Sequence, residues 1–74
     1  MVYLSNNEID SSKAKEIVRI FLAQYHAVLE VKEPILEDHT WIVDADVMSF
    51  GFKHLKRIKV NSETGRIMGY ELPS

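Results

Sequence analysis

The chain has 74 residues, no cysteine and a formal charge of −2, from 9 basic and 11 acidic side chains. Disulfides and thiolate zinc sites are therefore excluded, and the overall charge offers no general attraction to nucleic acid or to an anionic membrane. A domain this small has a thin margin of stability, and association with another chain is one way to widen it. No catalytic or ligand motif stands out, so composition leaves the function open.

The whole chain is expected to be one domain, residues 1–74, in which residues 1–10 form a flexible or loosely docked segment. The first residues lack the basic region and the apolar core of a signal peptide. No apolar stretch is long enough to cross a bilayer. We therefore expect a cytoplasmic protein without a membrane segment.

An amphipathic helix is the clearest predicted element. Between Ser12 and Leu29, apolar residues recur at intervals that place them on one side of a helix. They are Ala14, Ile17, Val18, Phe21, Leu22, Tyr25, Val28 and Leu29. Good capping residues at positions 10–12 predict a start at residue 11 or 12. The end is open, because no glycine or asparagine marks it and β-branched residues predict extended chain by about residue 30.

Four strands are expected after the helix. Pro34 restricts the first, near residues 30–37, to a sheet edge, and a polar turn follows at residues 37–40. From residue 41 the pattern alternates, with one face of the second strand apolar. That face carries Trp41, Val43, Ala45 and Val47, and the other carries Ile42, Asp44, Asp46 and Met48. We expect Phe21, Tyr25 and Trp41 to pack in the core rather than to form a ligand site.

The third strand is expected from Phe52 to Val60 and the fourth from Ile67 to Leu72, with Gly65 supplying a positive φ in the turn between them. A β-bulge between Leu55 and Ile58 would place Leu55 on the core face. Without that bulge, His54 and Lys56 would point inward, so we favour the bulge. The predicted fold class is α+β, with one amphipathic helix packed on a four-stranded antiparallel β-meander.

The last hairpin resembles the closing hairpin of PepSY domains, in which a strand reading V-x-V-D is followed by x-x-T-G-x-I. Here residues 58–69 read IKVNSETGRIMG, with Asn61 where the family has aspartate. The element order agrees over roughly residues 11–72. The resemblance implies a non-catalytic interaction module, as found in propeptides of thermolysin-like metalloproteases and in cell-envelope proteins. The matched residues, Thr64 and Gly65, would shape the turn.

Several polar residues are of types that could bind a metal or take part in catalysis. Carboxylates and imidazole are suitable metal ligands, but their spacing here matches no known metal motif, so we expect solvated surface groups and no metal. The candidates are Asp38, His39, Asp44 and Asp46. Ser49 and Ser62 lie in expected turns without an identifiable base. We therefore expect no catalytic residues, no enzymatic activity and no cofactor.

Two surfaces are candidates for partner contact. Basic residues on the third strand, next to Phe50 and Phe52, suit single-stranded nucleic acid, although Asp44 and Asp46 could instead pair with them across the sheet. These residues are Lys53, His54, Lys56, Arg57 and Lys59. Apolar residues on the outer face and on the last edge strand suit a protein partner; they are Ile42, Met48, Met68 and Tyr70. We expect a binding or assembly module that forms a homodimer, with nucleic-acid binding as the alternative.

Overall fold

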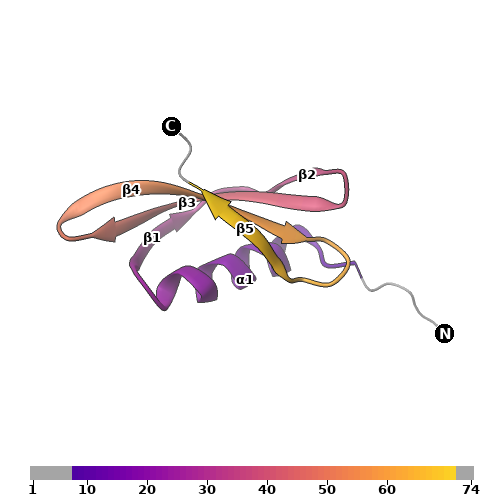
Figure 1. Ribbon diagram of the computed structural model, residues 1–74, viewed down its shortest axis with the longest axis horizontal. Helices are drawn as coiled ribbons and strands as arrows, with labels where there is room; N and C mark the ends of the chain where they lie inside the picture. The colour runs from indigo at the N-terminus through magenta and orange to yellow at the C-terminus, as the bar shows by residue number, and fades with distance from the viewer. Residues whose placement is uncertain (1–7, 72–74) are drawn as a thin grey trace.

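The computed structural model describes residues 8–71 and has one helix against one face of an antiparallel sheet (Figure 1). The helix α1 covers Ser11–Ala23. The strands are β1 (Ala27–Val31), β2 (Ile35–Glu37), β3 (Thr40–Ser49), β4 (Phe52–Asn61) and β5 (Ile67–Glu71). Their order in the sheet is β1-β3-β4-β5, with β2 also paired to β3. The predicted α+β class is confirmed, with one more strand than expected.

The helix begins where the capping residues predict and ends earlier than its apolar stripe. Asp10 is the N-cap, and its Oδ1 accepts a hydrogen bond of 2.9 Å from the Lys13 amide. After Ala23, the amides of Tyr25 and His26 both donate to the carbonyl of Leu22 and close the helix. Tyr25 is consequently 64% exposed, so the prediction that it packs in the core was wrong.

The expected first edge strand is divided into β1 and β2, which pair with different parts of β3. Val31 lies opposite Ala45, and Ile35 lies opposite Ile42. Pro34 separates the two strands; it has no amide hydrogen to contribute to a ladder, so pairing is interrupted beside it. The predicted meander is therefore preserved, because β1 and β2 together occupy the position of a single edge strand.

The predicted bulge in β4 is absent, and this expectation was wrong. Pairing between β3 and β4 continues without a shift from Thr40 opposite Asn61 to Ser49 opposite Phe52. Alternation then places His54 and Lys56 on the inner face, toward the helix, and Leu55 on the outer face. Lys56 is only half-buried there, as a long side chain with an apolar stem and a charged end can be.

The core lies between α1 and the inner faces of β1, β3 and β4. Its buried residues are Ala14, Val18, Leu22, Val31, Val43, Ala45, Val47, Ile58 and Val60. The alternation predicted for β3 and for the second half of β4 is thus confirmed. No helix among the described residues is long and apolar enough to span a bilayer.

The end of the core near the start of α1 is closed by hydrogen bonds. Trp41 is half-buried, and its Nε1 donates to the Ile9 carbonyl at 3.0 Å. The Ile9 amide in turn donates to the carbonyl of buried Ser62 at 2.8 Å. Ile9 therefore docks on the core. Residues 1–7, which belong to the segment expected to be loosely docked, lie outside the described residues.

Candidate functional site

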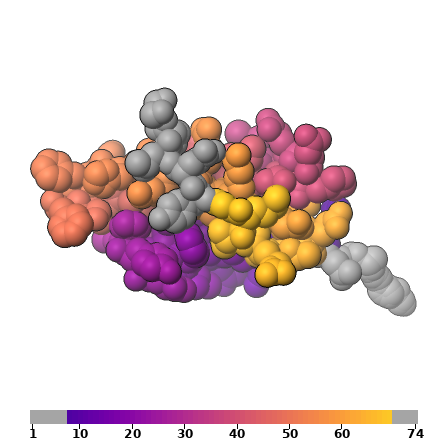
Figure 2. Space-filling view, in the orientation of Figure 1, coloured from indigo at the N-terminus to yellow at the C-terminus, as the bar shows by residue number. Residues whose placement is uncertain are grey.

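The hairpin that joins β3 to β4 carries the most exposed aromatic residues of the described chain. Phe50 is 96% exposed and Phe52 is 69% exposed. Met48 and Leu55, each 37% exposed, lie nearby on the same two strands. We call residues 48–55 the hairpin tip. In Figures 1 and 2 this tip stands out at the left end of the molecule, beyond the end of α1.

The backbone of the tip is unusual for a phenylalanine. Ser49 pairs with Phe52, which leaves a two-residue turn in which Phe50 has φ +53° and Gly51 has φ +80°. Such turns favour asparagine, aspartate and glycine, because a positive φ brings a Cβ close to the following carbonyl. Folding alone therefore does not explain a large apolar side chain at position 50.

A cavity of about 370 Å³ lies at the end of α1, between the helix and the inner face of β4. Its lining residues are Phe21, Leu22, Tyr25, His26 and Lys56. The rings of Phe21 and Tyr25 meet edge to face, with centroids 5.7 Å apart. At this volume the cavity is in the range of ligand sites, and its wall combines aromatic rings with a cation.

His26 adds an unusual feature to the wall of this cavity. Its Nδ1 is buried and has no hydrogen-bond partner among the described residues. A buried nitrogen without a partner costs about 1–3 kcal/mol relative to a satisfied one. The described residues thus leave the hydrogen-bonding capacity of this nitrogen unmet.

Both carboxylates that β3 places on the outer face of the sheet form ion pairs. Arg57 donates to both carboxylate oxygens of Asp44, at 2.9 and 3.2 Å. Asp46 lies 3.7 Å from the ammonium group of Lys32. The cross-strand pairing considered from the sequence is thus confirmed for Asp44, whereas Asp46 pairs with a residue that follows β1.

The basic residues of β4 do not form one surface. Alternation places Lys53, Arg57 and Lys59 on the outer face, and His54 and Lys56 on the inner face. Arg57 already pairs with Asp44. A polyanion would therefore meet at most part of this group from either side, which weakens the case for a nucleic-acid surface.

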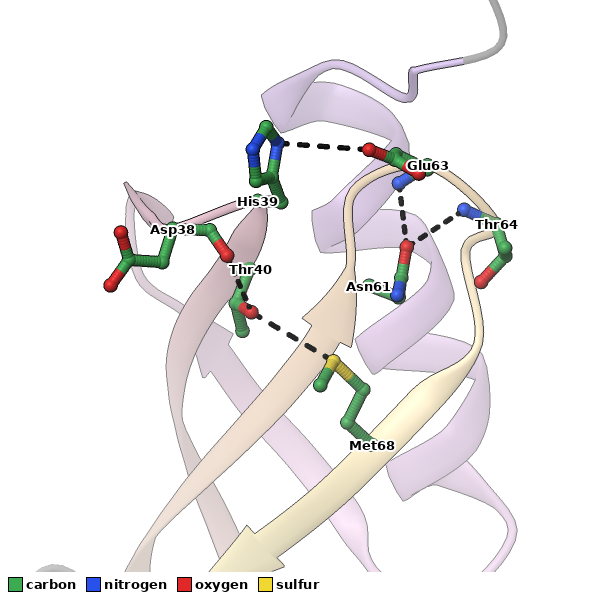
Figure 3. A network of polar contacts seen from close by, with 7 residues as sticks. All are labelled: Asp38, His39, Thr40, Asn61, Glu63, Thr64 and Met68. Carbon is green, nitrogen blue, oxygen red and sulfur yellow. Dashed lines mark hydrogen bonds and ion pairs between the residues drawn. The ribbon is translucent and has the colours of Figure 1, made fainter.

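The opposite end of the sheet carries a network of polar contacts (Figure 3). Asn61 Oδ1 accepts from the amides of Glu63 and Thr64, at 2.8 and 3.0 Å, and Gly65 has the predicted positive φ of +78°. The hydroxyl of Thr40 lies 3.8 Å from the Met68 sulfur. This network explains the shape of the last hairpin, and the turn predicted at residues 61–66 is confirmed.

The four side chains considered as metal ligands are not brought together. Among the described residues, the one group of three ligand-type side chains near one another consists of Glu8, His39 and Glu63, whose ligand atoms lie within 4.8 Å. His39 Nδ1 is 3.7 Å from Glu63 Oε2 (Figure 3). All three residues are exposed, as such surface groups commonly are, and we assign no metal site to them.

The apolar residues expected to contact a partner are spread over three regions. Ile42 is half-buried on the outer face beside Ile35, and Met48 belongs to the hairpin tip. Met68 is 57% exposed on β5, which pairs with β4 and, within the described residues, with no other strand. Tyr70 lies in β5, but its side chain lies outside the described residues.

The cavity and the exposure of Phe50 at the tip were not predicted from the sequence. The sequence contains one usable signal, two phenylalanines on either side of Gly51, between the expected second and third strands. The cavity gave none, because it depends on the helix ending at Ala23 and on Lys56 pointing inward. Comparison of the chain with family models, curated proteins and solved structures finds no match.

Proposed function

We propose that this domain is a non-catalytic binding module that acts through protein–protein contact, and that it binds a second copy of itself. The observation that supports this proposal is the hairpin tip. Phe50 is almost fully exposed on a backbone conformation that disfavours it. A residue that favours neither folding nor solubility is best explained by binding.

The small size of the domain supports association as well. A cysteine-free chain of 74 residues has a limited core, and burial of the tip would add apolar contacts that one copy cannot make. Large aromatic side chains are also the residues that most often dominate the energy of protein contacts. A PepSY-like role as an interaction module and a cytoplasmic location agree with this proposal and stay predictions from the sequence.

Sedimentation equilibrium across the micromolar range tests the proposal. We expect reversible association of the 8.6 kDa chain, weakened strongly by Phe50→Asn and little changed by Met68→Lys or Ile42→Lys. Loss of association in Met68→Lys alone would move the contact to the free edge of β5, and loss in Ile42→Lys alone would move it to the outer face. A single monomeric species at every concentration would refute self-association.

Nucleic-acid binding is the second candidate, supported by the cations of β4 and the neighbouring aromatic residues. Because the cations lie on two faces, we expect only weak binding to single-stranded oligonucleotides, without base preference and lost as salt rises. Micromolar binding at physiological salt that a Lys56→Ala/Arg57→Ala variant abolishes would favour this candidate instead.

A further inference from the structure

The hairpin tip and the cavity lie at the same end of the molecule. The hairpin of β3 and β4 extends past the end of α1, as Figure 1 shows, so the helix does not cover its last inner-face residues. Phe52 and His54 are such residues, and both are exposed. Two features of the described residues are thus unexplained in this half of the molecule: an exposed Phe50 and a cavity with an aromatic wall.

We propose that the tip of one copy inserts Phe50 into this cavity of a second copy, and that the second copy does the same in return. This inference rests on the proposed function, since it specifies how the self-association occurs. A two-fold axis makes both contacts identical, which closes the assembly as a dimer.

Size supports this occupant. A cavity of about 150 Å³ is large enough to hold a benzene molecule, and the cavity here is about 370 Å³. It therefore has room for the phenyl ring of Phe50 and part of the turn that carries it. A smaller aliphatic side chain would leave much of the space empty.

The chemistry of the wall also suits a phenyl ring. Phe21 and Tyr25 offer rings for edge-to-face or offset contacts, which add about 0.5–1.5 kcal/mol beyond area burial. The ammonium group of Lys56 can lie over the face of an entering ring, an arrangement that is favourable for cations within about 6 Å of the ring centre.

The geometry of the hairpin allows reciprocal insertion. Phe52 and Lys56 are four residues apart on β4, so the turn lies roughly 13 Å from the level of the cavity along the strand. Two hairpins can pack with their uncovered inner faces against each other and their turns pointing in opposite directions. In that arrangement each turn reaches the level of the other copy's cavity. The contact then also covers Phe52 and His54.

The expected affinity follows from the area available. An aromatic side chain buries about 150–250 Å², so Phe50 with the exposed parts of Phe52 and Tyr25 from two copies gives on the order of 1,000 Å². This is the lower end of specific interfaces, where contacts are weak and reversible. We therefore expect a dissociation constant in the micromolar range.

Mixing two variants tests the inference. Phe50→Asn removes the inserted ring and keeps the cavity, whereas Tyr25→Asp places a charge in the cavity wall and keeps the ring. Each variant alone is expected to dissociate at least about tenfold more readily than the parent, as loss of an aromatic anchor does. An equimolar mixture is expected to associate more tightly than either variant alone, because a mixed dimer regains one ring in one cavity.

Controls separate this contact from general effects. Gln24→Asp adds the same charge at the residue before Tyr25 but outside the cavity lining, and Leu36→Asn removes an exposed apolar residue from β2. Both are expected to dimerise like the parent, with circular dichroism verifying that every variant is folded. A dimer that neither variant weakens, or a mixture no tighter than its components, would overturn the insertion and leave the proposed function standing. A monomer at every concentration would refute both.

Discussion

Replacing Leu22 by alanine tests the packing of α1 on the sheet. Leu22 is 1% exposed and, with Ile58, is among the largest of the fully buried side chains of the described residues. Removal of a buried leucine side chain costs about 2–5 kcal/mol, because transfer energy is lost and a cavity remains. A domain of this size without disulfides has about 3–5 kcal/mol of stability in total. Leu22→Ala should therefore be largely unfolded at physiological temperature.

Ile20→Ala is the matched control, because it removes an aliphatic side chain from the same helix at a position that is 56% exposed. We expect this change to lower the free energy of unfolding by less than about 0.5 kcal/mol. Urea denaturation, followed by the fluorescence of Trp41 and by circular dichroism, measures both effects. Equal losses from the two variants, or a larger loss from Ile20→Ala, would refute the assigned orientation of the helix.

Three further changes probe single interactions. Asp10→Ala should lower the free energy of unfolding by about 0.5–2 kcal/mol through loss of the N-cap, with Asp10→Asn close to the parent in urea denaturation. At concentrations where the chain is monomeric, Phe50→Asn should raise the free energy of unfolding by about 0.5–1 kcal/mol, because asparagine tolerates a positive φ better than phenylalanine does. A melting temperature below that of the parent would contradict this explanation. A double-mutant cycle with Asp44→Ala and Arg57→Ala should give a coupling of about 0.2–1 kcal/mol that shrinks in high salt; a salt-independent value would contradict a surface ion pair.

Periodicity predicted the parts of the fold in which one face is buried. The alternation of β3 and the stripe of α1 through Leu22 both correspond to buried residues. The turn at Gly65 was predictable because its sequence requires a positive φ, which the structure contains. In each case a local rule and the tertiary packing favour the same conformation.

The helix end was not predictable, because the apolar spacing continues through Val28 and Leu29, yet both residues belong to β1, where Val28 pairs with Val47 of β3 and Leu29 lies at a register shift. A short apolar run fits a helix or a strand equally well, and here the tertiary context decides. The same applies to Lys56. Avoidance of an inward lysine predicted a bulge, yet continuous pairing with β3 keeps the alternation, and the cavity at the helix end accommodates the side chain.

The two ends of the molecule differ in how far contacts within one chain bond their polar groups and cover their apolar groups. At the start of α1, hydrogen bonds join Ile9, Trp41 and Ser62. In the turn of residues 61–66, the amides of residues 63–66 donate to oxygens of the turn itself, and the Ser62 amide donates to the His39 carbonyl. At the other end, Phe50 is exposed and the cavity beside His26 is open. Stability alone would favour asparagine at the turn and a helix long enough to cover the hairpin. Because the departures from these rules gather at one end, a binding role explains them together, whereas separate defects of folding would have no reason to be neighbours.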